Sequence, residues 1–196
     1  MRRWVVTGPA GAGKSVLCGF FATRGAAIVD GDRLGHEILA RKDIVSSVAM
    51  EFGSGVVTGG SVDRSALGAL VFADPVALRR LNRITHGPLA ELAGQRLDEL
   101  EKAGSHRLAV FEAAVYFLLP PVPAIDLVIA VTASITTRLA RLTGAAGLSA
   151  PEAQARIKAQ QSLDGGWSDA DVFLTNDGSL SDLEAAAGVV WSRLMD

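Results

Sequence analysis

The sequence contains little cysteine, little net charge and few aromatic residues, and each shortage excludes a class of function. The single cysteine, Cys18, cannot form an internal disulfide and cannot build a metal site from clustered thiolates. A formal net charge of -2 gives no general positive field that would attract nucleic acid. The three tryptophans are scattered and provide no stacking platform for single strands. We therefore expect a cytoplasmic protein without a nucleic-acid partner.

Long uninterrupted apolar runs are also missing. The apolar run after the first two arginines is broken by residues 8–11, G-P-A-G, too early for the core of a signal peptide. The most apolar stretch, residues 108–135, carries Glu112 and Asp126 and is interrupted by prolines between residues 120 and 123. We expect no export signal and no membrane partner, and we interpret this stretch as two buried strands joined by a rigid loop.

Short apolar segments alternate along the chain with longer segments that have helical spacing. Strands of a parallel sheet covered on both faces are apolar throughout, so the pattern predicts a parallel sheet between two layers of helices. The fold class we expect is α/β, a three-layer fold with a parallel five-stranded sheet. The expected strands are residues 4–7, 27–30, 108–111, 127–131 and 172–174.

The 196 residues are predicted to form a single domain whose core is interrupted by two excursions. We assign the core to residues 1–32, 107–135 and 162–196. Residues 33–106 have a mostly helical pattern, and we expect them to form an inserted acceptor-binding subdomain. Residues 136–161 are expected to form a small helical lid. The protein is expected to be a monomer or a weak homo-oligomer.

Glycine and proline residues indicate where helices bend or begin in both inserted segments, residues 33–106 and 136–161. In the insertion, Gly87 and Pro88 predict a kink or a restart of a helix, because proline removes a backbone hydrogen bond. In the lid, the loose glycine-alanine stretch at residues 144–147 precedes Ser149, which is placed to cap the next helix. A helical pair with a glycine hinge suits a lid.

The strongest functional signal is at residues 8–15, which read G-P-A-G-A-G-K-S and match the phosphate-loop pattern G-x-x-x-x-G-K-[ST]. The pattern follows an expected strand and precedes a helix-compatible run, a context that a plain glycine turn does not require. Lys14 would reach the β- and γ-phosphates of ATP, and Ser15 would bind Mg²⁺. Pro9 supplies no N–H to the phosphates. The residues expected to bind ATP here are Gly8, Gly11, Ala12, Gly13, Lys14, Ser15 and Val16.

Acidic residues follow two of the expected strands. Asp30 and Asp32 come after the second strand, with His36 four residues further on. Because ligands of such sheets bind at the carboxyl ends of the strands, one acid could accept a proton from an attacking hydroxyl. Either could instead cap the next helix, an alternative that is nearly even for Asp30 and weaker for Asp32. Glu112 ends the third strand and either orients magnesium-bound water or forms a strand-end salt bridge.

With these residues in order, the sequence resembles the dephospho-coenzyme A kinase family along nearly its whole length. Many kinases share the phosphate loop, but the D-x-D at residues 30–32, the G-x-x-D-R at 60–64 and the L-N-x-I-x-H at 81–86 are specific in combination. Further similar positions are residues 34–36, 67–68, 71–72, 74–75, 141–142, 147–149, Ala153, 156–157, Gln160, 170–172 and 176–178.

The resemblance implies the three-layer P-loop kinase fold. It also implies transfer of the ATP γ-phosphate to the ribose 3′-hydroxyl of dephospho-coenzyme A, the last step of coenzyme A synthesis. It implies that Asp32 is the general base and that Arg141 contributes charge toward the phosphates. Asn176 lies in the segment similar to the adenine-side loop of the family. His36, Arg64 and His86 match the acceptor-side motifs, and for His86 a structural role is equally supported.

Two segments depart from the family pattern. Residues 112–118 read E-A-A-V-Y-F-L where the family has D-x-P-L-L-F-E, so acceptor contacts there are expected to differ. Ala145 and Ala146 stand where the family carries an arginine and an acid before G-L-S. A lid arginine stabilises transition-state charge, so its absence predicts a slow enzyme or a substitute such as Arg138.

Two other functions are compatible with these residues. One is a P-loop kinase for a different nucleotide or nucleoside acceptor. The other is a diverged nucleotide-binding protein with little turnover, an alternative supported by the altered third-strand segment and by Ala145 and Ala146. Against the second alternative, Lys14, Ser15 and Asp32 are all present.

Overall fold

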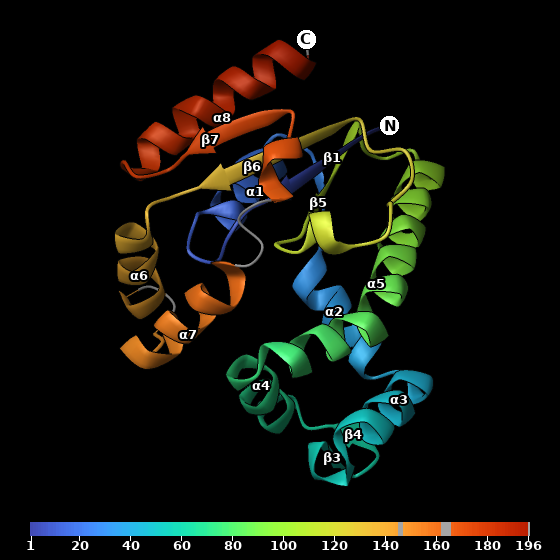
Figure 1. The fold of residues 1–196 in the computed structure, drawn as a ribbon. Coiled ribbons are helices and arrows are strands. Elements are labelled where there is room, and N and C mark those ends of the chain that lie inside the picture. The colour runs from blue at the N-terminus through green and yellow to red at the C-terminus, as the bar shows by residue number, and fades with distance from the viewer. Residues whose placement is uncertain (145–146, 162–165, 196) are drawn as a thin grey trace.

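A computed structural model describes residues 1–144, 147–161 and 166–195, and its centre is a five-stranded parallel sheet (Figure 1). The strand order is β2-β5-β1-β6-β7, and every neighbouring pair is parallel. The α/β class and the five strands predicted from the apolar segments are confirmed. The strands are β1 Arg2–Thr7, β2 Ala27–Asp30, β5 Leu108–Glu112, β6 Leu127–Thr132 and β7 Val172–Thr175.

Alternate residues of the central strand β1 enter two separate cores. Trp4 and Val6 pack with α1 (Lys14–Ala22) and α8 (Leu180–Met195) on one face of the sheet. Val5 packs on the opposite face with residues of α2 (Gly31–Leu39) and α5 (Pro75–Ala103). Because successive side chains of a strand point to opposite faces, β1 is buried on both sides. This arrangement is the three-layer fold.

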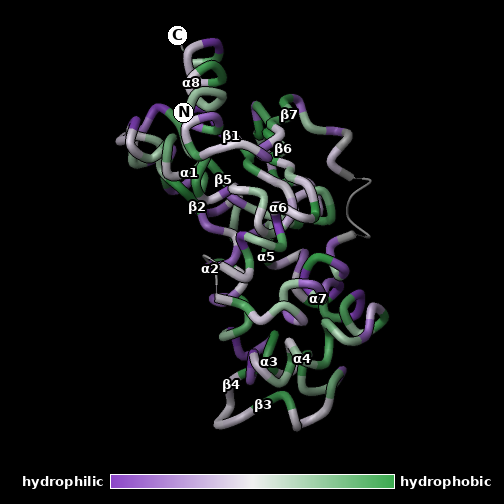
Figure 2. The backbone as a smooth tube through the Cα atoms, turned by 90° about the vertical axis from the view of Figure 1, so that its left-hand side faces the viewer, coloured by the Kyte–Doolittle hydropathy of each residue, from purple (hydrophilic) through white to green (hydrophobic). Residues whose placement is uncertain are grey.

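The chain between β2 and β5 is mainly helical and extends away from the sheet (Figures 1 and 2). Pro88 lies inside α5, which stays one helix but changes direction along its length in Figure 1, so the predicted kink occurs and the restart does not. The other elements here are α3 Lys42–Phe52, the short helix η1 Ser54–Val56, the hairpin strands β3 Val57–Thr58 and β4 Ser61–Val62, and α4 Arg64–Ala73.

Two helices, α6 (Ile135–Gly144) and α7 (Ala150–Gln161), form a pair between β6 and β7. The predicted cap is present: Ser149 Oγ accepts from the backbone N–H of Glu152 at 3.5 Å, and Glu152 Oε2 accepts from the backbone N–H of Ser149 at 2.9 Å. The pair has its own small core, made of Leu142, Ala153 and Ile157. The remaining elements are the short helices η2 Tyr116–Leu118 and η3 Gly166–Asp169.

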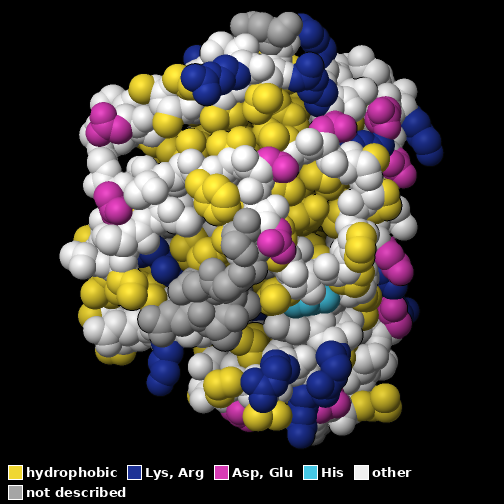
Figure 3. Space-filling model, turned by 45° about the horizontal axis from the view of Figure 1, so that its top comes forward, with side chains coloured by type: hydrophobic (Ala, Val, Ile, Leu, Met, Phe, Trp, Pro, Cys, Tyr) yellow, Lys and Arg dark blue, Asp and Glu magenta, His cyan; other side chains and the backbone are white. Residues whose placement is uncertain are grey.

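Helix length and surface charge bear on whether the described parts of the chain could contact a membrane or nucleic acid. No helix among residues 1–144, 147–161 and 166–195 combines the length and apolar character needed to cross a membrane. On the face shown in Figure 3, Lys and Arg side chains gather in separate groups near its upper and lower edges, with acidic side chains between them. The described side chains of that face form no continuous basic surface.

Candidate active site

The phosphate-loop sequence forms the turn between the end of β1 and the start of α1. Gly8 and Gly13 have φ angles of 133° and 106°, which side chains of other residues rarely adopt. A Cβ atom on Gly8 would lie 2.0 Å from the carbonyl oxygen of Val131, and one on Gly13 would lie 2.3 Å from Asn176 Nδ2. The loop therefore packs against β6 and the end of β7 too closely for any residue but glycine at these positions.

Four successive carbonyl groups of the loop, those of residues 9–12, all accept hydrogen bonds. An acceptor paired in this way fixes the orientation of its peptide plane, which is what a cradle of inward-pointing N–H groups requires. The donors are Ala12 N and Lys14 Nζ for Pro9 (both 3.2 Å), Arg138 Nε for Ala10 (2.9 Å), Arg141 Nη1 for Gly11 (3.4 Å) and Asn176 Nδ2 for Ala12 (2.7 Å).

Arg141 and Asn176, which we expected at the phosphates and in the adenine-side loop, are joined to each other behind the phosphate loop. Arg141 Nη1 donates to the backbone carbonyl of Asn176 at 2.9 Å, and Nη2 lies 3.4 Å from its Oδ1. The Asn176 side chain is buried. Both side chains therefore contact the phosphate loop at its backbone carbonyl groups.

Charged groups from three elements meet beside the loop. Burial lowers the pKa of Lys14 below its usual value, while the negative charges of Glu112 and Asp32 oppose this shift. Ser15 Oγ donates to Glu112 Oε1 at 2.7 Å. The parallel register places Asp30 beside Glu112, at the carboxyl ends of β2 and β5. The sheet thus brings Lys14, Ser15, Asp32 and Glu112 together, as predicted from the strand ends.

Asp30 and Asp32 have different roles in the structure. Asp30 Oδ1 accepts hydrogen bonds from the backbone N–H groups of Asp32 and Arg33 at 2.9 and 3.2 Å, so Asp30 is the cap of α2. The Asp32 side chain is exposed and has no hydrogen-bond or ion-pair partner among the described residues. Of the two acids, only Asp30 has a carboxylate oxygen engaged in capping a helix.

The donor set beside the loop fits a magnesium ion. No group of three His, Cys, Asp or Glu side chains that could hold a metal occurs among the described residues. Ser15 Oγ and the Glu112 carboxylate nevertheless present two adjacent oxygens. Mg²⁺ commonly takes one or two protein oxygens and completes its octahedron with phosphates and water. The pairing of Glu112 with Ser15 also differs from the strand-end salt bridge considered as its alternative.

The expected acceptor-side residues lie on three different helices. His36 on α2 and Arg64 on α4 are exposed, and within the described ranges neither side chain has a hydrogen-bond or ion-pair partner. His86 on α5 is half-buried, and its Nδ1 lies 3.1 Å from the carbonyl oxygen of Leu118. Burial lowers the pKa of His86. No hydrogen bond or ion pair joins these three side chains to the phosphate loop in the described part of the chain.

The segments that depart from the family pattern are partly accounted for. Residues 112–118 continue from β5 into η2, whose last residue, Leu118, receives the contact from His86. Ala145 and Ala146 lie outside the described residues. Arg138, named above as a substitute for the missing arginine, is buried and bonded to the loop carbonyl of Ala10.

One residue of the site had no role in the predictions. Gln160, near the end of α7, accepts a hydrogen bond from the backbone N–H of Ala10 at 2.7 Å. The two residues are 150 positions apart, so no local pattern links them. Only the place of Gln160 among the residues similar to the family could have drawn attention to it.

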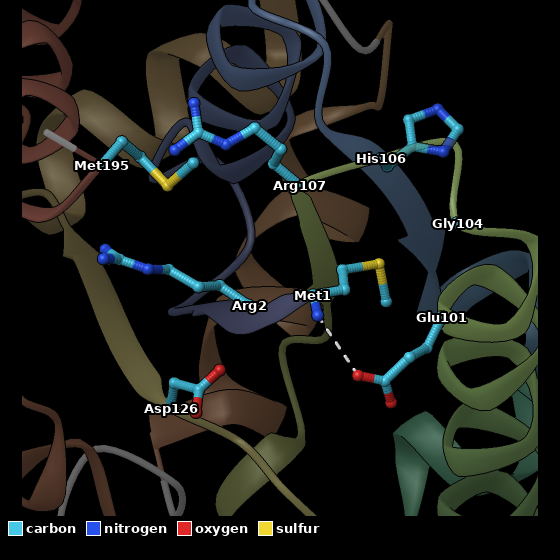
Figure 4. A pocket seen from close by; sticks show the side chains of 8 residues that line it. All are labelled: Met1, Arg2, Glu101, Gly104, His106, Arg107, Asp126 and Met195. Atoms are coloured by element: carbon cyan, nitrogen blue, oxygen red, sulfur yellow. Dashed lines mark hydrogen bonds and ion pairs between the residues drawn. The ribbon is translucent and has the colours of Figure 1, made fainter.

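A separate cavity lies at the amino ends of β1 and β5, the opposite end of these strands from the phosphate loop (Figure 4). Its volume is about 540 Å³, and the N-terminal amine in it pairs with Glu101 Oε1 at 3.2 Å. None of the predicted site residues lines it. The lining residues are Met1, Arg2, Glu101, Gly104, His106, Arg107, Asp126 and Met195.

Comparisons with known proteins agree over nearly the whole chain. A family model described as Dephospho-CoA kinase matches residues 4–182. The dephospho-CoA kinase of Streptomyces avermitilis is 37% identical over 97% of this chain and 92% of its own length. A crystal structure of TT1252 from Thermus thermophilus superposes with a TM-score of 0.75 at 30% identity, covering 98% of this chain and 97% of that one. Shikimate kinase from Bacteroides thetaiotaomicron, at 14% identity and a TM-score of 0.53, shares the fold.

Proposed function

The chain belongs to the dephospho-CoA kinase family, and on that premise we propose which of its residues carry out the reaction. It is an ATP-dependent kinase that phosphorylates dephospho-CoA in coenzyme A biosynthesis. We assign the ribose 3′-hydroxyl as the phosphate acceptor and Asp32 as the base that takes its proton. The observation that carries this assignment is the exposed Asp32 carboxylate, which has no partner in the described ranges and acts electrostatically on Lys14.

The phosphate loop binds and orients the donor. Its free N–H groups and the amino end of α1 bind the phosphates of ATP. The Lys14 ammonium stabilises the negative charge that develops on the transferred phosphoryl group. Such catalysis depends on positioning and on fixed charges more than on covalent chemistry. Arg141 and Asn176 support it by holding the loop carbonyls that lie behind the cradle.

Ser15 and Glu112 are the residues that would hold Mg²⁺, since their oxygens already adjoin. When bound, the ion supplies charge neutralisation for the phosphates. Glu112 also keeps the Ser15 hydroxyl oriented in the absence of the ion, because its carboxylate accepts a hydrogen bond from that hydroxyl.

The acceptor would be held by the helical insertion, residues 33–106. His36 and Arg64 offer side chains that no described residue engages, and an arginine is well suited to a phosphate or diphosphate group. His86 has one ring nitrogen at the Leu118 carbonyl and the other available. The helical pair at residues 136–161 would form the lid over the donor.

Replacing Asp32 tests the assignment. We expect Asp32→Asn to reduce kcat for 3′-phosphorylation of dephospho-CoA by roughly 10²- to 10⁴-fold, the usual contribution of a general base, while calorimetry still detects ATP binding. Asp30→Asn is the matched control, because asparagine keeps the α2 cap, and its kcat should stay close to that of the wild type. Equal turnover by Asp32→Asn and the wild type would show that another group takes the proton.

A further inference from the structure

Ala10 of the phosphate loop is held on three sides by the helices α6 and α7. Its N–H donates to Gln160 Oε1 on α7 at 2.7 Å, and its carbonyl accepts from Arg138 Nε on α6 at 2.9 Å. Its methyl group packs against the small core of the helical pair, formed by Leu142, Ala153 and Ile157. Every group through which this loop residue can interact is therefore engaged by the pair.

The next loop residue touches the same pair through its backbone. A Cβ atom built on Gly11 would lie 2.9 Å from the carbonyl oxygen of Arg138 and 3.1 Å from its Cα. At this distance the backbone of α6 is in direct contact with the loop. The helical pair cannot move relative to the loop without breaking the contacts of Ala10 and Gly11 or carrying the loop with it.

Arg138 brings two separable properties to this contact. Its Nε–H is a hydrogen-bond donor to the loop, and its buried guanidinium, only 3% exposed, carries a positive charge that acts on nearby Lys14. If Arg138 replaced the lid arginine, its positive charge would act on the phosphates. Its Nε–H is instead bonded to the loop and its guanidinium is buried. Both observations favour the hydrogen bond, which holds the loop in its conformation.

We propose that Arg138 and Gln160 are positioning residues that couple ATP binding at the phosphate loop to the helical pair α6–α7 through Ala10. The proposal rests on the proposed function, in that ATP must occupy the loop. ATP that orders the loop then orders the pair, and by reciprocity a pair detached from Ala10 weakens ATP binding by the same factor. Neither residue touches the transferred phosphoryl group.

Substitutions at Arg138 separate the hydrogen bond from the charge. Arg138→Gln keeps an N–H donor without charge, and Arg138→Met removes both at similar length. We expect Arg138→Met to raise the Kd and KM for ATP about tenfold, the size expected for one lost hydrogen bond to a charged donor. The KM for dephospho-CoA should stay unchanged, and Arg138→Gln should recover most of the loss. Equal defects in both variants, confined to kcat, would overturn the proposal in favour of a charge that stabilises the transition state.

Hydrogen exchange of α7 provides the direct readout of coupling. In the wild type, saturation with magnesium and the non-hydrolysable analogue AMP-PNP should slow amide exchange across residues 150–161. In Gln160→Met, the analogue at saturation should give little added protection of these residues. Gln154→Met is the matched control, because Gln154 is an exposed glutamine on the same helix, and it should behave as the wild type.

A second variant keeps the test decisive if a substitution on the helices impairs folding. Ala10→Gly removes the methyl group from the core of the pair without changing either helix, and it should also reduce the protection of α7. AMP-PNP that binds the wild type without protecting residues 150–161 overturns the coupling alone. AMP-PNP that does not bind the wild type overturns both the coupling and the assignment of the phosphate loop.

Discussion

The phosphate loop and the acceptor side of this site differ in how their polar groups are occupied. In the loop, the carbonyls of residues 9–12 are all paired, with donors that come from α1, α6 and the segment after β7 as well as from the loop itself. On the acceptor side, the side chains of Asp32, His36 and Arg64 are exposed and have no partner in the part of the chain that the structure describes. The phosphate loop is therefore held in place before a ligand binds, whereas the acceptor side presents side chains without partners among the described residues.

The difference follows from what each half binds. A triphosphate needs several N–H groups that converge on one point, and holding them in place before binding reduces the entropy lost on binding. The acceptor side must receive a larger molecule through separate helices, so its groups remain available until that molecule arrives. Changes in the loop should therefore affect folding and ATP binding together. Changes at His36 and Arg64 should affect acceptor binding without affecting folding.

The largest expected effect comes from filling the space at Gly8. Gly8→Ala would put a Cβ atom 2.0 Å from a β6 carbonyl at a φ of 133°, and we expect it to lower the free energy of unfolding by about 3 kcal/mol. Gly59, in the hairpin of the insertion, has a φ of 60° and no atom within 4 Å of such a Cβ, so Gly59→Ala should cost only about 1 kcal/mol. Denaturant unfolding measures both. Equal losses of unfolding free energy in the two variants would show that the phosphate loop is no more tightly packed than the hairpin of the insertion.

A smaller effect is expected from Arg64. Arg64→Met should raise the KM for dephospho-CoA about tenfold, the size of one lost charge-assisted hydrogen bond, and leave the KM for ATP and the melting temperature unchanged. Arg79→Met is the control, because Arg79 is another exposed arginine of the insertion, and it should leave all three values unchanged. A change in the melting temperature on replacing Arg64 would mean that the acceptor side is as tightly built as the loop.

The smallest effect is a displacement of the alkaline limb of the pH profile. Burial lowers the pKa of Lys14, so in the free enzyme Lys14 loses its proton, and with it the attraction for phosphate, at a lower pH than an ordinary lysine. We therefore expect kcat/KM for ATP to fall with rising pH before the usual lysine range is reached. In Lys14→Arg, whose guanidinium stays protonated, this limb should disappear from the profile of whatever activity remains. An unchanged limb would assign the titration to another group.

Local sequence was sufficient for the strands and for the phosphate loop. Continuous apolar runs such as residues 4–7 predict strands buried on both faces, and β1 is buried in this way. The glycines at residues 8, 11 and 13 belong to the phosphate-loop pattern, and all three have positive φ angles in the structure. Asp30 and Asp32 were harder to separate, because either can cap a helix two or three residues later, and only the hydrogen bonds of Asp30 decide between them.

By itself, the sequence determined that a phosphate loop follows the first strand and that an acid follows the second, because both features depend on neighbouring residues and on the period of buried strands. Only the tertiary structure decided that Arg138, Gln160 and Asn176 would hold that loop. These residues are 128, 150 and 164 positions from their partners, and their side chains meet the loop only after the sheet has brought α6, α7 and the end of β7 beside it. Hydrogen bonds over such separations leave no periodic trace in a single sequence.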